Sequence, residues 1–445
     1  MKSFRFILSI CSAILTFSCS ENPFAASPST QHSIDYKISE QDILHYLNLY
    51  HNIHLTKSDI NQRIIPVLND GDTVMFIVNY DAGWELLSAD ARMPRVLAMS
   101  EVGNLDSIES LCSNPAQTDY IENLKDKITS LNDMNEDIIM ADDNWSDVYM
   151  VNESTDTWTD WYLTGVQLYR TDTMHDQDHL MLTKWNQTYP WNTKTPYMNS
   201  NMNNHCYTGC TIVAACQVLY YLQDFFNISV PIYGSCTCNA YIPDGAQFIQ
   251  LNSSNVIFDE STVSDTYWDL MPLSFSSSSN HTYTATLMTH MGYLLGAKYK
   301  TTGTSAATYG IYDAYRNEFG IDCEKKYFSE IDEDLLIEQI VENKLPCILE
   351  MWNTNNEGHV VVLDGFRQIR RVYIYHYQKH NNQAEVIQRD VSVSEYSNYV
   401  AINWGWGGSN DIDSSGATIW YNLGASWDTY NDFQEFICNF SLLAN

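Results

Sequence analysis

The first part of the chain alternates apolar and polar positions in short segments. A capping signal at 39–42 precedes apolar residues at helical spacing up to Tyr50, which predicts an amphipathic helix. Four short apolar runs separated by turn residues follow, at 64–68, 74–78, 84–87 and 96–99. Runs of this length between turn residues are typical of antiparallel strands. Residues 34–105 are therefore predicted to form a small α+β domain.

Residues 106–178 carry a weaker pattern. Helix signals between 118 and 132 give way to an acidic run that is rich in Asp, Asn, Thr and Trp and continues to 178. Such a composition is typical of a linker. We predict that this linker separates two folded domains and contains the site at which a precursor is cut.

Longer apolar segments return from His179 onward. The run that starts at Cys210 contains neither Gly nor Pro up to Leu222, which predicts a buried helix. Further helices are expected at 287–295, 306–319 and 332–342, and strands at 347–351, 358–366, 372–375 and 399–403. The polar stretch 376–398 is a long excursion between the last two of these strands.

Composition narrows the class of protein. The chain has 445 residues, of which 44% are hydrophobic and 13% aromatic, as expected for a globular protein with a substantial core. Its 23 Lys and Arg residues stand against 55 Asp and Glu residues, which gives a formal net charge of -32. A chain of this charge is unsuited to neutralising a phosphate backbone, so we expect no nucleic-acid partner.

The first 33 residues indicate export. Residues 1–18 resemble a bacterial signal peptide, because two basic residues precede an apolar stretch too short to span a bilayer. Cys19 ends this stretch in a pattern similar to lipoprotein signals, and plain cleavage is the alternative. Residues 19–33 are predicted to be a flexible tether. We expect a bacterial protein that is extracellular, on the outer surface or periplasmic, and that meets a membrane only through a lipid on Cys19.

The remaining cysteines include at least one free thiol. Of the eleven in the chain, Cys11 leaves with the signal and Cys19 would carry the lipid, so an odd number remains. Cys236 and Cys238, together with His205 and Cys206, raise the alternative of a zinc site. A one-residue spacing fits a tetrahedral site poorly, so we expect surface-loop cysteines and no metal or cofactor.

Cys210 is the first candidate for chemistry. It follows Gly209 and opens the predicted buried helix, and the dipole and free N–H groups of a first helical turn favour a thiolate. Gly209 would let a substrate carbonyl approach both the sulfur and the Cys210 N–H. The alternative is a cysteine packed as a small hydrophobic residue, which is the interpretation we give to Cys216.

Three further residues supply what a nucleophilic thiol needs. His359 stands at the mouth of an apolar strand, where a general base belongs, although a structural histidine is the alternative. Asn403 ends another strand beside tryptophans, and its amide could orient that imidazole. Gln187 lies upstream of the thiol and could donate to an oxyanion, and a surface glutamine is the alternative.

These residues stand in four motifs that together resemble the streptopain family of papain-like cysteine peptidases. The motifs are Trp185-Asn186-Gln187 with Pro190, His205 with Thr208-Gly209-Cys210, Gly358-His359 with Asp364-Gly365, and Asn403-Trp404-Gly405-Trp406-Gly407-Gly408. Their order of glutamine, cysteine, histidine and asparagine is the papain-like order. The last motif is the most specific, because two tryptophans interleaved with glycines rarely recur by chance.

The resemblance implies an α+β fold in which residues 179–445 form a papain-like catalytic domain with a helical part and an antiparallel sheet. It implies a precursor whose domain at 34–105 inhibits the peptidase until it is cut away. By the family's roles, Cys210 is the nucleophile and His359 the base and acid. Gln187 donates to the oxyanion, and Asn403 and Trp404 hold and shield the imidazole. Protein or peptide substrates with a hydrophobic residue just upstream of the scissile residue are expected.

The chain also departs from the family pattern. Glu357 and Val360 flank the histidine where the family usually has Gly and Ala, and 376–398 and 411–415 differ from its usual turns. Substrate preference is therefore expected to differ. Two alternatives follow, a catalytically weak surface binding or adhesion protein that retains the fold, and a papain-like amidase that acts on cell-wall peptides. The four motifs favour the cysteine endopeptidase.

Overall fold

The structure is a computed structural model of the whole chain. It describes residues 36–51, 63–132, 162–197, 204–227, 238–242, 247–251, 266–299, 303–327, 330–352, 358–380, 386–408, 411–412, 416–424 and 435–443. The chain divides into two units, Met1–Tyr36 and Lys37–Asn445, and every helix and strand named below belongs to the second. The predicted signal peptide and tether, with Cys19, lie outside the described residues.

The predicted helix and four strands near the start of the chain are confirmed. They are α1 (Glu40–His51), β1 (Ile64–Asn69), β2 (Asp72–Tyr80), β3 (Gly83–Ser88) and β4 (Val96–Ser100). The capping signal forms as expected, because the Ser39 N–H donates to Asp42 Oδ2 at 2.8 Å and the Asp42 N–H donates to Ser39 Oγ at 3.3 Å. The strands pair in sequence order as antiparallel neighbours.

The prediction of a linker over 106–178 is wrong for its described residues. They form the short helix η2 (Ile108–Leu111), the helix α3 (Pro115–Asn132) and the strand β5 (Tyr162–Gln177). One side of α3 is buried, through Ala116, Tyr120, Ile121, Leu124 and Ile128. This helix therefore packs as part of the folded N-terminal region, which extends past the predicted boundary at 105.

Helices and a small sheet make up one side of the catalytic region. The helices are α5 (Cys210–Phe225), α6 (Thr266–Asp269), α7 (Thr282–Leu294), α8 (Gly310–Phe319) and α9 (Glu333–Leu336), which continues into the π-helical turn η5 (Ile337–Glu342). The small sheet has the order β7 (Gln247–Leu251), β6 (Cys238–Ile242), β8 (Lys298–Tyr299) and β9 (Thr304–Ser305). The helices predicted around 210, 287, 306 and 332 are confirmed.

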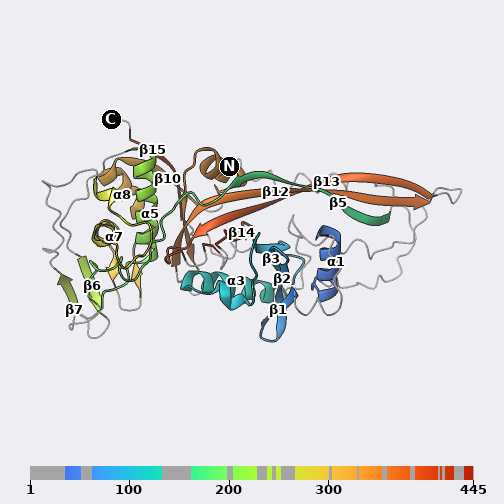
Figure 1. Cartoon of the computed structure of the whole chain (residues 1–445), viewed down its shortest axis with the longest axis horizontal. Coiled ribbons are helices and arrows are strands. Elements are labelled where there is room, and N and C mark those ends of the chain that lie inside the picture. Colours follow the sequence, from blue (N-terminus) through green and yellow to red (C-terminus); the bar gives the residue numbers. More distant parts are fainter. Residues whose placement is uncertain are drawn as a thin grey trace, which may run out of the picture. The chain divides into compact units, whose positions relative to one another are not determined.

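A large antiparallel sheet runs through the second unit (Figure 1). Its further strands are β10 (Ile321–Tyr327), β11 (Cys347–Trp352), β12 (Gly358–His380), β13 (Val386–Asn403), β14 (Trp420–Asn422) and β15 (Glu435–Leu442). The order is β1-β2-β3-β4-β14-β13-β12-β11-β15-β10. Trp420 of β14 lies opposite Met99 of β4, so the N-terminal strands extend the sheet of the catalytic region.

The polar excursion at 376–398, to which no strand was assigned, is part of a long hairpin of β12 and β13, visible as the longest ribbons in Figure 1. On its other edge, β12 pairs with β11 up to Leu363 and with β5 from Phe366 to Gln378. The polar residues of this stretch gave no apolar alternation to detect. Backbone hydrogen bonds between β12 and β13, and between β12 and β5 up to Gln378, hold them extended without a buried face.

The first residues of β12 are buried on both faces and divide the core in two. Val360 and Val362 pack with α5, α7 and α8, whereas Val361 and Leu363 pack with α3 and the N-terminal strands. Successive side chains of a strand point to opposite faces, so α5 and α3 lie against opposite sides of the same strand. The predicted α+β class, with a helical part and an antiparallel sheet behind a small N-terminal α+β region, is confirmed. Among the helices the structure describes, none is both long and apolar enough to cross a bilayer.

Candidate active site

Cys210 is the first residue of α5, as the sequence predicts. Gly209 precedes it with a φ of 101°, in the region that favours glycine, and a Cβ at this position would lie 2.9 Å from the Thr304 carbonyl oxygen. The remainder of α5 is almost wholly buried among apolar side chains. The helix is therefore fixed in the core, and its first turn presents the sulfur at its N-terminus.

His359 meets Cys210 at the start of β12. It pairs with Met351 of β11, and the N–H of the next residue, Val360, donates to the Cys210 sulfur at 3.4 Å. Burial opposes ionisation of this thiol, but hydrogen bonding to His359 and its positive charge, with N–H groups of the backbone, lower the Cys210 pKa. The sulfur and the imidazole, 149 positions apart in sequence, are therefore neighbours in the fold, and their contact favours the charged form of each group.

A carboxylate on α3 completes a line of three charged groups. Asp119 Oδ2 lies 2.7 Å from His359 Nε2, and both side chains are largely buried. Burial lowers the pKa of His359, yet the hydrogen bonds and charges of Asp119 and Cys210 outweigh it and raise this pKa to about 9. No sequence motif marks Asp119, which lies in a segment expected to be a linker. The weak helix signal at 118–132 indicated the helix on which Asp119 lies, but not its contact with His359.

The face to which His359 points explains this contact. His359, Val361 and Leu363 alternate with Val360 and Val362, so they share the side of β12 on which α3 packs. The histidine therefore turns toward α3, while the N–H of Val360 reaches the thiol on α5. The apolar pattern of the sequence was enough to predict this strand. The contact of the His359 imidazole with Asp119 depends on the packing of α3 against the strand.

Gln187 is buried, with 6% of its surface exposed, so the surface alternative is wrong. Its backbone oxygen accepts from the Thr208 N–H at 2.9 Å, which ties its loop to the segment that leads into Cys210. Among the described residues, its side-chain Nε2 has no hydrogen-bond partner. A buried amide donor without a partner is costly for stability and ready to bind an added acceptor.

Asn403 and Trp404 lie in the core behind the pair. The Asn403 Nδ2 donates to the Thr183 carbonyl at 3.1 Å, and its Oδ1 accepts from Gln217 Nε2 at 3.0 Å and from the Gly405 N–H at 3.1 Å. These bonds hold the amide to the helix and loops, and the Nε2 of His359 is taken by Asp119 instead. The part that Asn403 plays toward the histidine stays a prediction.

The indole of Trp404 is fully buried between two tyrosines. Its ring centroid lies 6.0 Å from that of Tyr120 on α3 and 5.5 Å from that of Tyr421 on β14. Gln117 of α3 also donates to the Tyr421 hydroxyl at 2.9 Å. The aromatic side of the candidate site is therefore covered by the same helix that supplies Asp119.

Two residues that depart from the family pattern are structural in this fold. The Asp411 carboxylate accepts from the Trp404 N–H at 3.1 Å, and its backbone oxygen contacts His179 Nε2 at 3.2 Å. His179 Nδ1 also lies 2.7 Å from Asp364 Oδ1, which fixes the start of the catalytic region to β12. Val360 supplies the N–H on the thiol. Glu357 lies outside the described residues.

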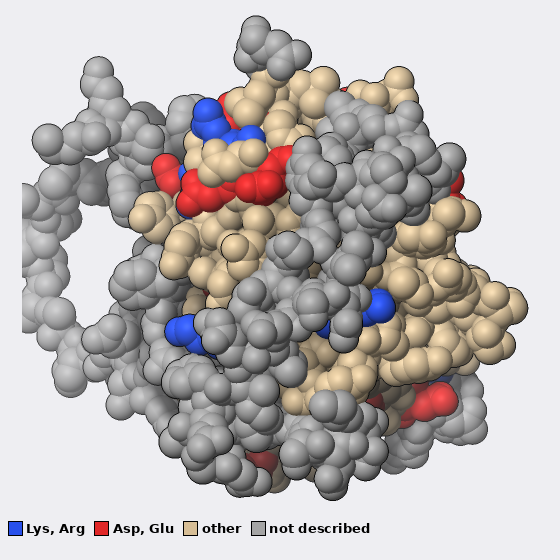
Figure 2. Space-filling model, turned by 90° about the vertical axis from the view of Figure 1, so that its left-hand side faces the viewer, with Lys and Arg blue, Asp and Glu red and all other residues tan. Residues whose placement is uncertain are grey.

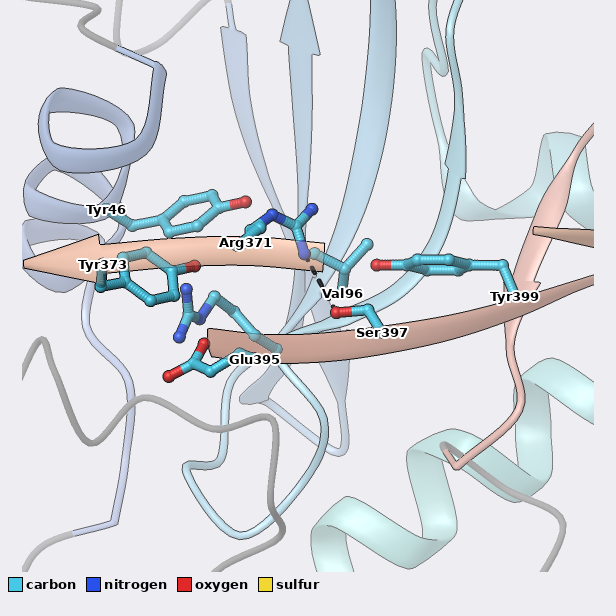
Figure 3. Close-up of a pocket in the computed structure, with 8 residues that line it drawn as sticks. Tyr46, Val96, Arg371, Tyr373, Glu395, Ser397 and Tyr399 are labelled. Carbon is cyan, nitrogen blue, oxygen red and sulfur yellow. Dashed lines mark hydrogen bonds between the residues drawn. The ribbon is translucent and has the colours of Figure 1, made fainter. Parts of the chain in front are cut away.

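A separate small pocket lies between α1, β4, β12 and β13 (Figure 3). Its lining consists of Tyr46, Arg95, Val96, Arg371, Tyr373, Glu395, Ser397 and Tyr399. Arg371 donates to Ser397 Oγ at 3.0 Å across the hairpin. None of the predicted catalytic residues lines this pocket, so it is not the candidate active site. Within the described part of the chain, no group of His, Cys, Asp or Glu side chains is arranged to hold a metal ion.

The comparisons with known proteins match the part of the chain that contains the candidate active site. A family model described as the peptidase C10 family matches residues 185–412, a range that includes Gln187, Cys210, His359 and Asn403. No curated protein matches the chain significantly. Among solved structures, a fragment of prointerpain A from Prevotella intermedia is similar, with 18% identity and a TM-score of 0.48. The alignment covers 84% of this chain and 97% of that one.

Proposed function

Because this chain belongs to the peptidase C10 family and is a cysteine-type peptidase, we propose that it hydrolyses peptide bonds of proteins through attack of Cys210 on the scissile carbonyl. Membership of this family confirms the resemblance of its motifs to streptopain. The contact of Cys210 with His359 at the junction of α5 and β12 is the observation that carries the mechanism.

In the proposed reaction, the thiolate sulfur forms a bond to the carbonyl carbon, and the carbonyl oxygen takes the negative charge. The Cys210 N–H and the unpartnered Nε2 of Gln187 would donate to that oxygen. The protonated His359 gives its proton to the nitrogen of the leaving amine as the C–N bond breaks. Water, deprotonated by the neutral imidazole, then hydrolyses the acyl-enzyme and restores the thiolate.

We further propose that the described chain is an inactive precursor held by α3. Asp119 binds the catalytic histidine, Tyr120 packs against Trp404, and Gln117 binds Tyr421. These three contacts place the helix over the residues that the reaction requires. The N-terminal region up to Asn132, rather than up to 105, would act as the inhibitory propeptide. Cutting the chain after α3 would allow this helix to leave His359 and Trp404.

Apolar side chains around the Gln187 loop support a preference for hydrophobic substrates. Leu182 and Tyr189 are 71% and 72% exposed on either side of Gln187, and Phe275 packs against Trp191 of the same loop. Figure 2, which faces the side where α5, α7 and α8 lie, shows a described surface of mostly uncharged residues, with Lys and Arg in a few separate spots and a band of Asp and Glu beside one of them. Apolar contact, more than charge, would then select the substrate. Export and a lipid on Cys19 remain part of the proposal for its location.

The function is tested by alkylating the thiol. Activated protein treated with iodoacetamide should lose casein cleavage in proportion to label on Cys210, measured by peptide mass spectrometry, while a metal chelator should have no effect. Activity that persists with Cys210 fully labelled would exclude the mechanism. Turnover of muropeptides without cleavage of casein would assign the amidase alternative, and tight protein binding without any turnover the adhesion alternative.

The contact between Asp119 of α3 and His359 should make the stability of the unprocessed chain depend on pH. Because the His359 pKa is raised from 6.5 to about 9, the protonated ring stabilises the fold fully below about pH 6.5, and this contribution is lost as the pH rises through 9. Cys210 contributes part of that shift, so in a Cys210→Ala chain Asp119 is the main group that raises the His359 pKa. In that chain, we expect Asp119→Asn to lower the free energy of unfolding by about 1–2 kcal/mol near pH 6. Near pH 10 the difference should largely vanish. Urea unfolding at both pH values measures it.

Asp126→Asn is the matched control, because Asp126 is an exposed carboxylate on the same helix. It should change the stability little, and equally at both pH values. If Asp119→Asn and Asp126→Asn follow the same dependence on pH, the contact between Asp119 and His359 does not hold α3 in place.

A further inference from the structure

Gln217 joins three parts of the candidate active site that are distant in sequence. It lies on α5 seven residues after Cys210, a spacing that returns to nearly the same side of a helix. Its side chain is fully buried between the helix and the sheet. A polar amide in such a place must be hydrogen-bonded, and its partners show what it holds.

The partners belong to the two other catalytic segments. Gln217 Oε1 accepts from the Trp185 N–H at 3.2 Å, two residues before Gln187. Gln217 Nε2 donates to Asn403 Oδ1 at 3.0 Å, next to Trp404. The acceptor side of Gln217 thus fixes the loop of the oxyanion donor, and the donor side fixes the end of β13.

The other hydrogen bonds of Trp185 in the described structure do not reach α5, although its indole packs edge to face against Tyr220 of that helix. The Trp185 indole donates to the Pro272 carbonyl at 2.8 Å, and the Trp185 oxygen accepts from the Gly407 N–H at 2.9 Å. These two bonds tie the loop to its neighbours but not to the helix that carries the thiol. Gln217 makes that connection, and the Thr208 N–H on the Gln187 oxygen makes a second one just before the helix begins.

We propose that Gln217 is a positioning residue, which sets the Gln187 loop and Asn403 against the helix that carries Cys210. The inference rests on the proposed function and names a residue that touches no substrate. An oxyanion donor acts only if it lies at hydrogen-bond distance from the developing charge, so a loop released by even a fraction of an ångström loses much of its effect. Gln217 should therefore affect turnover more than substrate binding.

Gln339 provides a matched control within the same protein. It is also a buried glutamine, its Nε2 donates to Asn439 Oδ1, and its Oε1 accepts from the Asn439 N–H at 3.0 Å. This pair joins η5 to β15 and includes no residue of the candidate site. Replacing either glutamine by methionine keeps the volume and removes a similar set of hydrogen bonds.

The experiment expresses Gln217→Met and Gln339→Met as full chains and activates them in the same way. Hydrolysis of a fluorogenic peptide and urea unfolding are then measured for both variants. We expect similar losses of stability, but a decrease in kcat of about tenfold or more with KM within about twofold only for Gln217→Met. Equal kcat values for the two variants, or a loss confined to KM, would overturn the proposal.

Gln217→Glu provides a second test of these hydrogen bonds if Gln217→Met does not fold. A protonated glutamic acid can accept from Trp185 and donate to Asn403 as glutamine does, whereas the ionised form would face the Asn403 oxygen without a donor. Its kcat relative to the parent at the same pH should rise as the pH falls. A ratio that does not change with pH would contradict the role of the Nε2 donor.

Hydrogen exchange separates this inference from the proposed function. The Trp185 amide should exchange faster in the unprocessed Gln217→Met chain than in the parent or in Gln339→Met, whether or not the protein is a peptidase. Unchanged exchange at Trp185 would overturn the positioning role by itself. Faster exchange in Gln217→Met, together with a parent protein that cleaves no peptide, would support the positioning role and reject the peptidase mechanism instead.

Discussion

Cys210→Ala is expected to lower kcat for peptide cleavage by a factor on the order of 10⁴ or more, because the Cys210 sulfur is the nucleophile of the proposed reaction. The thiol is the one cysteine of the described residues whose pKa is lowered, through hydrogen bonding to His359 and its charge against the effect of burial. Hydrolysis of a fluorogenic peptide by activated protein, with the variant activated in trans, measures the loss.

Cys216→Ala is the control for this substitution, because Cys216 lies on the same helix and burial raises its pKa well above the ordinary value. We expect it to retain turnover within about twofold and to lose only some stability from the smaller side chain. Activity in Cys210→Ala comparable to that of Cys216→Ala would show that the sulfur of Cys210 is not the nucleophile.

Gln187→Ala is expected to have the second largest effect, a decrease of about 10²–10³-fold in kcat with little change in KM. The amide is already buried, and in the described structure its Nε2 has no partner, so it is free to donate when an oxyanion develops. Because no hydrogen bond of that nitrogen is lost in the resting protein, the free energy of unfolding should change by no more than about 1 kcal/mol.

Alkylation distinguishes an oxyanion donor from a residue that merely shapes the site. Iodoacetamide reacts with the thiolate without forming a tetrahedral oxyanion, so its rate constant with Cys210 should be nearly the same in Gln187→Ala and in the parent. A parallel loss of alkylation and turnover would mean that Gln187 acts on the thiolate or on folding, and the proposed oxyanion role would be rejected.

The sequence predicted the parts of the molecule whose chemistry is local. An unbroken apolar run defined α5, a glycine with positive φ fixed where it begins, and Cys210 followed as the residue at its N-terminus. The apolar strand that starts after His359 was equally clear. These predictions succeed because helix starts and buried strands are set by neighbours within a few residues.

The same rules failed where long-range pairing stabilises a polar segment. β5 and the outer half of the β12–β13 hairpin are exposed over much of their length, and ion pairs such as Arg370 with Asp172 cross between the strands. Without a buried face there is no period-two apolar pattern. For this reason no strand was predicted for β5, which lies within the linker expected over 106–178, or for the described residues of 376–398.

By itself, the sequence determined which residues are the candidates for the chemistry, because a thiol, an imidazole and two amides stand in motifs whose types and order are fixed along the chain. The tertiary structure alone decided their partners. It turned His359 toward Asp119 on α3, bound Asn403 to Gln217, and buried Gln187 with its donor unpaired. The two contacts join residues 240 and 186 positions apart, and the Gln187 Nε2 has no hydrogen-bond partner among the described residues. They depend on which faces of β12 and α5 are covered, and local periodicity carries no information about that.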